Sequence, residues 1–230
     1  MPASAVDKEI AGYIGRLVRD SMGRGPKSVN ISLSGPFVVI YLRDLLSPME
    51  EILLDEGQER TVVTTREVWM KRILPDIRAA IKLITHQDVV EVYYDWSLHN
   101  RSGTIVGVAA EPDAFGVASK ESPYKDELLR EVDMISQAVQ KSPDSMSLYE
   151  IDSRTVVVTR EGILVPIEKE LLRLHHEVLL KYAKRELEKR HLHNDDRFDL
   201  IFQRKVVDIF ADWLLESDKS VIVFKLNPSQ

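Results

Sequence analysis

One short stretch of the chain gathers groups that could bind an anion. Gly23-Arg24-Gly25-Pro26-Lys27 combines two glycines with two cations, so its exposed N–H groups could hold bicarbonate or phosphate. It lacks the spacing of a Walker or Rossmann loop and follows a helical pattern instead of opening one. The competing interpretation is a helix stop and a turn. Anion binding by Gly23, Arg24, Gly25 and Lys27 is therefore a hypothesis.

A second stretch concentrates metal-capable side chains, from His191 and His193 to Asp195 and Asp196. Such a run is also typical of a helix end followed by the cap of the next helix. Elsewhere, His176-Glu177 begins like a zinc-protease helix, but a leucine takes the place of the second histidine. We therefore predict no metal, no cofactor and no catalytic residue, and we interpret the chain as a non-enzyme.

The composition limits the classes of protein that remain. The 230 residues contain no cysteine, which suits a reducing cytoplasm and excludes disulfides and thiolate metal sites. The net charge of −6 is spread evenly over both halves, so the basic face of a nucleic-acid binder is not expected. No apolar run approaches the roughly 20 residues that cross a bilayer. We expect a cytoplasmic protein without direct membrane insertion.

The elements that would position any site are organised around Leu46-Ser47-Pro48-Met49-Glu50. Ser47 and Glu50 have the spacing of a capping box, in which each side chain bonds the other residue's backbone N–H. Pro48 falls at the first helical position, where its missing N–H costs nothing. The apolar run at 37–42 before it predicts a strand that is buried on both faces. The stretch therefore joins a buried strand to a helix.

This junction occurs twice. Leu164-Val165-Pro166-Ile167-Glu168 repeats it 118 residues later, although Val165 cannot cap a helix as Ser47 does. Further identities follow in the same order at separations of 117 or 118, and the one-residue difference falls at the turn of the first hairpin; they include Pro26 with Pro143, Val38 with Val156, Asp95 with Asp212, and Trp96 with Trp213. We predict a first repeat at 1–109, a linker at 110–122 and a degenerate second repeat at 123–230.

Each repeat has the pattern of helix, hairpin, long helix and hairpin. Consecutive hairpin strands favour antiparallel sheets with helices packed on one face, so the predicted class is α+β. The long helix of the first repeat is expected to break near Gly57 and to bend at Pro75. In the second repeat, Ser122-Pro123 is expected to open a helix. The charge-rich run at 181–190 predicts a solvated helix, or a partner-binding helix whose apolar stripe includes Val178 and Leu179.

The order of these elements, with their motif residues, resembles the MpsC-like family of bacterial proteins, formerly a domain of unknown function. The resemblance covers nearly the whole chain as two tandem copies, and the first copy fits better. The residues that carry it are Gly23, Gly25, Pro26, Leu46, Ser47, Pro48, Glu50, Arg66 and Asp95.

The resemblance implies a role beside a membrane. The family is named for a Na⁺-linked, membrane-potential-generating system associated with inorganic-carbon uptake, whose large membrane subunits carry the transport. It implies a non-enzymatic accessory or regulatory subunit that reaches the inner face of the membrane through transporter subunits. The alternative is a small-anion sensor that uses Gly23–Lys27 or the groove between the repeats. Either form could be a monomeric pseudo-dimer or a homodimer.

Overall fold

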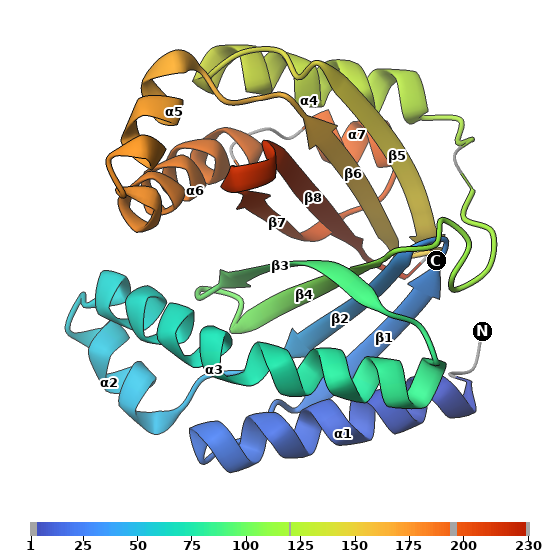
Figure 1. Ribbon diagram of the computed structural model, residues 1–230, viewed down its shortest axis with the longest axis vertical. Coiled ribbons are helices and arrows are strands. Elements are labelled where there is room, and N and C mark those ends of the chain that lie inside the picture. Colours follow the sequence, from blue (N-terminus) through green and yellow to red (C-terminus); the bar gives the residue numbers. More distant parts are fainter. Residues whose placement is uncertain (1–3, 120, 194–196, 229–230) are drawn as a thin grey trace. The chain divides into compact units, whose positions relative to one another are not determined.

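The computed structural model describes residues 4–119, 121–193 and 197–228. The chain forms two compact units, Met1–Val117 and Ala118–Gln230, and the same succession of elements recurs in both. Each unit is an antiparallel four-stranded sheet with its own helices (Figure 1).

The first unit follows the predicted order of helix, hairpin, helices and hairpin. Its sheet has the strand order β1-β2-β4-β3, with every neighbouring pair antiparallel. Its elements are α1 (Ala5–Met22), β1 (Ser28–Ser34), β2 (Phe37–Arg43), α2 (Pro48–Asp55), α3 (Glu59–Thr85), β3 (Val89–Ser97) and β4 (Ser102–Ala109).

The second unit repeats this order with the sheet β5-β6-β8-β7. Its elements are α4 (Lys125–Val139), β5 (Ser145–Asp152), β6 (Thr155–Glu161), α5 (Pro166–Arg173), α6 (Glu177–His193), α7 (Arg197–Phe202), β7 (Val206–Leu214), a 3₁₀ turn (Leu215–Ser217) and β8 (Lys219–Leu226). Helices α6 and α7 stand where the first unit has the single helix α3.

The core of each unit lies between its sheet and its long helices. In the first unit, α1 and α3 lie together on one side of the sheet (Figure 1). Alternate residues of β2, such as Val38, Ile40 and Leu42, pack with the stripe Ile10, Ile14 and Val18 of α1. Strand β2 is buried on both faces up to its last residue, as its unbroken apolar run predicts.

The backbone conformation shows the duplication more clearly than the residue types do. Four positions with positive φ recur 117 or 118 residues apart: Asp44 with Gly162, Gly57 with His175, His86 with Gln203, and Arg101 with Asp218. Residues other than glycine adopt this conformation uncommonly. The shared backbone has therefore been kept where the residue types have changed.

The one-residue difference between the repeats also has a structural counterpart. In the first hairpin of the second unit, the pairing of β5 with β6 shifts register between Glu150 and Asp152, next to the turn. The matching pairing of β1 with β2 is regular throughout. The extra residue is absorbed as a bulge at the predicted place, and the rest of the hairpin keeps its register.

Most sequence predictions about the fold are confirmed. The class is α+β and the chain is a tandem repeat, as predicted. The two copies form separate sheets, a point that the sequence had left open. The long helix of the first unit breaks around Gly57, whereas α3 continues through Pro75. The predicted helix start at Ser122-Pro123 is wrong: these residues form a turn before α4, whose N-cap is Tyr124 without a side-chain hydrogen bond.

Candidate functional site

The family-motif residues of the first unit meet at the start of α2. Ser47 accepts a hydrogen bond from the Glu50 N–H at 3.3 Å, and Glu50 Oε2 accepts one from the Ser47 N–H at 2.8 Å. The predicted capping box is therefore present, with Pro48 at the first helical position. Leu46, just before it, is buried. Because the box draws Glu50 back against the strand end, its carboxylate faces the interior.

Arg66 reaches this carboxylate from α3. Its Nε donates to Glu50 Oε1 at 2.7 Å and its Nη2 to Glu50 Oε2 at 3.2 Å, a two-point ion pair. Nη2 also donates to the Leu45 carbonyl at 2.8 Å, and the guanidinium lies 4.8 Å from the Trp96 ring centroid. We call Ser47, Glu50, Arg66 and Trp96 the motif cluster. Only 1% of the Arg66 surface is exposed.

The electrostatics of the motif cluster favour the ionised carboxylate. Burial by itself raises the pKa of Glu50, but the hydrogen bond and charge of Arg66 and the hydrogen bonds with Ser47 together outweigh burial. The pKa of Glu50 therefore lies below its ordinary value. The motif cluster thus connects the start of α2 with α3 and with Trp96 of the sheet. Its ion pair and hydrogen bonds therefore have a structural role.

The second unit contains a version of the same cluster. Glu168 accepts from the Val165 N–H at 2.9 Å and pairs with Lys184 Nζ at 2.6 Å, and Lys184 lies 5.7 Å from the Trp213 ring centroid. Burial lowers the pKa of Lys184, and the charge of Glu168 opposes that shift only in part. Lysine replaces the two-point arginine here, and Gln140 supplies an additional acceptor.

A second buried polar group has no counterpart in the first unit. Arg160 of β6 is 0% exposed; its Nη1 donates to Ser136 Oγ at 3.0 Å and pairs with Glu188, and its Nε donates to Ser220 Oγ at 2.9 Å. We call Ser136, Arg160, Glu188 and Ser220 the polar quartet. The sequence patterns did not predict it. A position-by-position comparison of the repeats would have shown that Arg160 takes the place of Leu42 in a strand that is expected to be buried.

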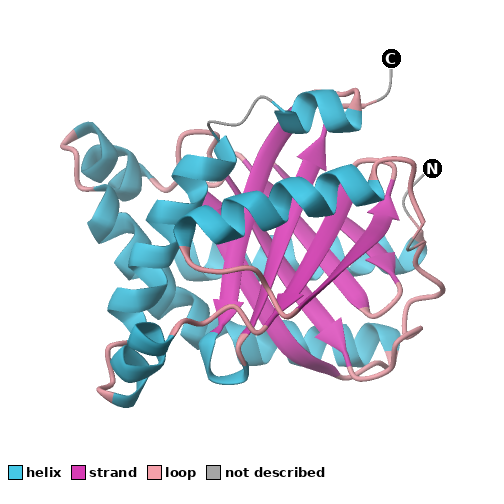
Figure 2. Cartoon of the chain, turned by 90° about the horizontal axis from the view of Figure 1, so that it is seen from above, coloured by secondary structure: helices cyan, strands magenta, loops and turns pink. Residues whose placement is uncertain are grey.

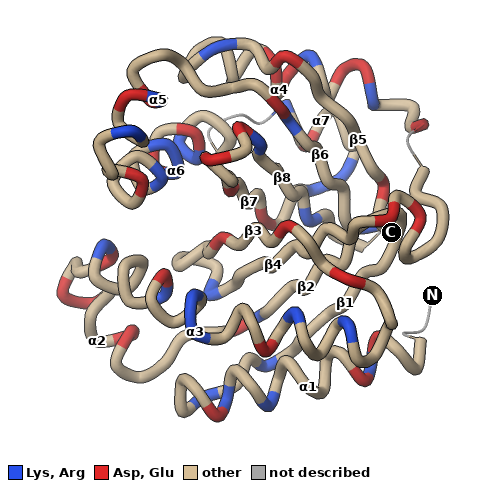
Figure 3. Tube along the Cα trace, viewed as in Figure 1, with Lys and Arg blue, Asp and Glu red and all other residues tan. Residues whose placement is uncertain are grey.

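The quartet corrects the predicted solvated helix at 181–190. Charges do lie along the whole of α6 (Figure 3), but Lys184, Arg185 and Glu188 are buried. Each has an opposite charge: Glu168 for Lys184, Asp212 for Arg185 at 3.0 Å, and Arg160 for Glu188. The periodicity of charge on the helix did not reveal this, because the partners come from the sheet and from α5.

The two Asp-Trp pairs are arranged as the strand geometry predicts. Trp96 and Trp213 lie in the helix-side cores, and the preceding aspartates point to the opposite face of each sheet. Asp95 is nevertheless buried and accepts a hydrogen bond from the Trp96 N–H at 2.7 Å. Asp212 is buried as well and pairs with Lys181 and Arg185.

The structure places the predicted anion loop between α1 and β1. Gly23 caps α1 in the left-handed conformation and donates its N–H to the Arg19 carbonyl, while Lys27 donates its N–H to the Arg43 carbonyl. Arg24 lies 3.9 Å from Glu51. Two N–H groups of the loop thus serve the fold. Anion binding there stays a prediction, which calorimetric titration with bicarbonate would test.

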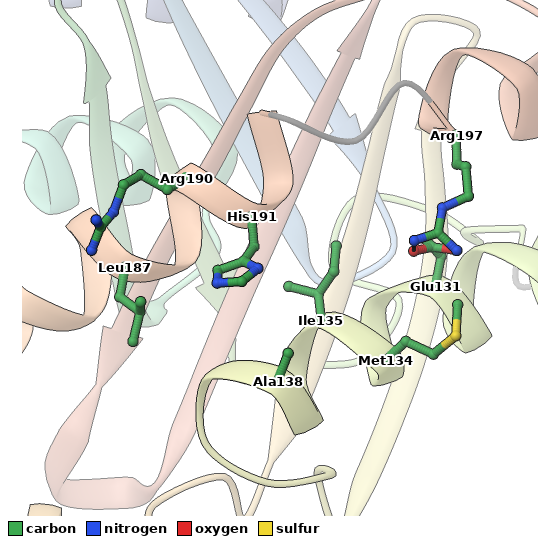
Figure 4. Close-up of a pocket in the computed structure, with 8 residues that line it drawn as sticks. All are labelled: Glu131, Met134, Ile135, Ala138, Leu187, Arg190, His191 and Arg197. Carbon is green, nitrogen blue, oxygen red and sulfur yellow. Dashed lines mark ion pairs between the residues drawn. The ribbon is translucent and has the colours of Figure 1, made fainter.

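The metal-capable stretch is divided by the structure. His191 lines a pocket of about 460 Å³ between α4, α6 and α7 (Figure 4). His193 lines a separate pocket of about 110 Å³. Asp195 and Asp196 lie outside the described residues. Among the described residues, no group of three or more histidine or acidic side chains is arranged to hold a metal ion.

Both units expose large apolar side chains near their short helices. In the first unit these are Met49, 64% exposed, and Ile52 on α2. In the second unit they are Ile167 on α5, Leu174, and Val178 and Leu179 at the start of α6, with Val178 63% exposed. These short helices and the helix starts that follow them project beyond the ends of the strands (Figures 1 and 2).

The fold and its repeated motif cluster define a tandem-duplicated α+β protein, and comparison with known proteins gives its family. The family model for the Na⁺-translocating membrane potential-generating system, MpsC, matches residues 3–111 and again residues 130–228. The chain belongs to this family and contains two copies of its module. No curated protein and no solved structure matched the chain. Within the described residues, every helix is too short or too polar to cross a membrane.

Proposed function

We propose that this protein is a non-enzymatic accessory subunit of a bacterial Na⁺-translocating system that generates membrane potential and supports bicarbonate uptake. Membership of the MpsC family over both halves of the chain is the observation that carries the proposal. The subunit works at the cytoplasmic face and reaches the membrane through polytopic transporter subunits. It binds no nucleic acid, in keeping with its acidic net charge of −6.

The apolar ends of the two units are the proposed docking surfaces. Each combines two or three exposed apolar side chains of neighbouring helical segments, namely Met49 and Ile52 in one unit and Ile167, Val178 and Leu179 in the other. Clusters of this kind on a soluble surface are typical of protein interaction sites, whereas single exposed aliphatics are ordinary. Duplication gives one chain two such surfaces, which suits a monomeric pseudo-dimer that engages two subunits.

An affinity pull-down from gently solubilised host membranes, read by quantitative mass spectrometry, tests this function. The tagged chain is expected to recover a polytopic transporter-like subunit, and two double variants, Met49→Asp with Ile52→Asp and Ile167→Asp with Val178→Asp, are each expected to reduce that recovery. Leu200→Asp is the matched control, because Leu200 is equally exposed but lies on α7. Recovery that is absent, or unchanged in both double variants, would overturn the proposal.

A physiological measurement separates an accessory role from mere association. Cells that lack this protein but keep the membrane subunits are expected to show reduced Na⁺-dependent bicarbonate uptake. The uptake should return with the wild-type chain and fail to return with the double variants. Normal uptake without the protein would contradict the proposed role, whatever the pull-down recovers.

A further inference from the structure

We propose that the pocket between α4, α6 and α7 binds a small organic anion that has a carboxylate or phosphate head and an apolar body. Its lining combines cationic and apolar side chains with one acid. The lining residues are Glu131, Met134, Ile135, Ala138, Leu187, Arg190, His191 and Arg197. All of them belong to the second unit, so the proposal is independent of the accessory role.

The first unit shows why the pocket is open. At the position equivalent to Leu187, 118 residues earlier, Trp69 fills the space between α1 and α3, and its indole N–H donates to Ser21 Oγ at 2.8 Å. Leucine leaves much of that space empty. One turn further on, the buried Ile73 of the first unit corresponds to the exposed His191. Trp69 and Ile73 thus fill this space in the first unit, whereas the second unit has a cavity with polar side chains at its edge.

The described lining residues have an excess of positive groups. Glu131 is buried, and Arg197 Nη2 neutralises it at 2.9 Å. Arg190 donates its Nε to the Glu186 carbonyl at 3.3 Å, and no ion pair of its guanidinium occurs within the described residues. Arg190 and Arg197 lie on opposite sides of the pocket, with His191 between them (Figure 4). A guanidinium with unused N–H groups favours a carboxylate or a phosphate.

The apolar half of the lining requires more than a bare ion. Ile135 faces the His191 ring across the pocket (Figure 4), and Met134, Ala138 and Leu187 extend the apolar surface on both sides. Met134 and Leu187 are partly exposed without a ligand, so a bound aliphatic group would remove apolar surface from water. The volume of about 460 Å³ suits a small molecule. The chemistry therefore indicates an amphipathic anion.

Isothermal titration calorimetry with three probes tests the binding chemistry. Octyl phosphate has both required parts, inorganic phosphate lacks the apolar body, and octyl glucoside lacks the charge. Octyl phosphate, kept below its micelle concentration, is expected to bind at least tenfold more tightly than either other probe. Absence of heat with octyl phosphate at millimolar concentration, or equal binding of octyl glucoside, would overturn the proposal.

Matched variants place the binding in this pocket. Arg190→Gln is expected to weaken octyl phosphate binding about tenfold, the typical effect of losing one charged hydrogen bond. Arg72→Gln removes the same charge from the equivalent exposed position of the first unit and is expected to change nothing. Leu187→Trp should refill the pocket and abolish binding, with circular dichroism to confirm folding. Equal weakening by Arg190→Gln and Arg72→Gln would overturn the site.

The same variants distinguish a free metabolite from a lipid as the natural ligand. Flotation with phosphatidylglycerol vesicles, against phosphatidylcholine vesicles, reports binding to an anionic lipid surface. Vesicle binding that Arg190→Gln and Leu187→Trp reduce, but Arg72→Gln does not, would support the pocket and identify a lipid source. Octyl phosphate binding without vesicle binding would support a soluble ligand. Vesicle binding that Arg190→Gln and Arg72→Gln reduce equally, and that Leu187→Trp leaves unchanged, would count against the pocket, because it would reflect net charge alone.

Discussion

The two repeats share one backbone fold, but part of the interior is apolar in the first unit and polar in the second. Where the second unit has Arg160, Glu188 and Ser220, the first has Leu42, Met70 and Gly103, 118, 118 and 117 residues earlier. The fourth member of the polar quartet, Ser136, is fully buried on α4 as Val18 is on α1. The sheet register confirms the correspondence, because Leu42 pairs with Gly103 and Arg160 pairs with Ser220. Val18, Leu42 and Met70 are fully buried in the apolar core. The difference indicates that this module can have either an apolar or a polar interior at these four positions, provided that all four residues change together.

Physical reasons explain why the set changes as one. A buried arginine costs several kcal/mol of desolvation, which only a close opposite charge and satisfied hydrogen bonds offset. Arg160 finds these in Glu188 and in the hydroxyls of Ser136 and Ser220. An arginine in place of Leu42 would find Val18 and Met70 where Arg160 finds the Ser136 hydroxyl and the Glu188 carboxylate. Partial mixtures of the two sets should therefore be the least stable proteins of all.

The largest expected effect comes from such a mixture. Glu188→Met introduces the first unit's residue and leaves the Arg160 guanidinium buried without its charge partner, which should cost about 3–5 kcal/mol of unfolding free energy. Urea denaturation followed by far-ultraviolet circular dichroism would measure it. The exposed neighbour Glu186 provides the control, since Glu186→Met should change stability by less than about 0.5 kcal/mol.

Exchange of all four residues of the polar quartet completes this test. Ser136→Val, Arg160→Leu, Glu188→Met and Ser220→Gly together rebuild the first unit's interior in the second. Because well-packed apolar sets often replace buried ion pairs without loss, the fourfold variant should regain most of the stability that Glu188→Met loses. A fourfold variant as unstable as the single one would show that the polar quartet does more than satisfy its own charges.

The next effect concerns the glycine of this set. A Cβ on Gly103 would lie 2.2 Å from Trp96 Cε3, so the indole packs directly on the glycine. Gly103→Ala must displace Trp96 and with it the stacking on Arg66, which should cost about 1–3 kcal/mol. In the second unit Ser220 already has a Cβ, so Ser220→Ala should leave Trp213 in place and should lose stability only through the hydrogen bond from Arg160 Nε. Thermal denaturation of Gly103→Ala measures the loss of stability, and near-ultraviolet circular dichroism of both variants reports whether the tryptophan has moved. Equal displacement of the tryptophan in the two units would contradict the comparison.

A smaller effect concerns the helix caps. Ser47 caps α2 through its hydroxyl, while Val165 at the matching place has no side-chain acceptor. Ser47→Ala should destabilise the first unit by about 1 kcal/mol. Val165→Ser should stabilise the second unit by a similar amount, because Glu168 already bonds the Val165 N–H and only the hydroxyl is missing. Chemical denaturation of the two variants would show shifts of opposite sign; a loss of stability in Val165→Ser would contradict the shared geometry.

The sequence predicted the backbone far better than it predicted the interior. Ser47, Pro48 and Glu50 act locally, within one helical turn, so their spacing alone indicates the cap and the junction. The periodicity of strands and helices likewise gave the order of elements and the duplication. Arg66 lies 16 residues from Glu50, and the partners of Arg160 lie 24, 28 and 60 residues away, on other elements. No local pattern encodes such contacts, which is why α6 read as a solvated helix.

The pocket was missed for the same physical reason. A cavity is defined by what neighbouring elements fail to fill, and Leu187 is unremarkable until Trp69 is seen at the same place in the other repeat. His191 was noted for its neighbours in sequence, whereas in the structure its relevant neighbours are Ile135 and Ala138 on α4. Comparison of the repeats is the signal that could have found both the quartet and the pocket.

The smallest expected effect is a pH dependence of the motif cluster. The folded-state pKa of Glu50 is lowered, so its ion pair with Arg66 stabilises the fold fully above the unfolded-state value near 4.5. That contribution should fade as the pH falls from about 4.5 through the lower folded-state value, because protonation then removes the charge from the carboxylate. Glu50→Gln should be less stable at neutral pH and should lose less stability than the wild type on acidification. Urea titrations between pH 7 and pH 3 compare the slopes; parallel curves would mean that acid sensitivity arises elsewhere and that the motif cluster acts through packing alone.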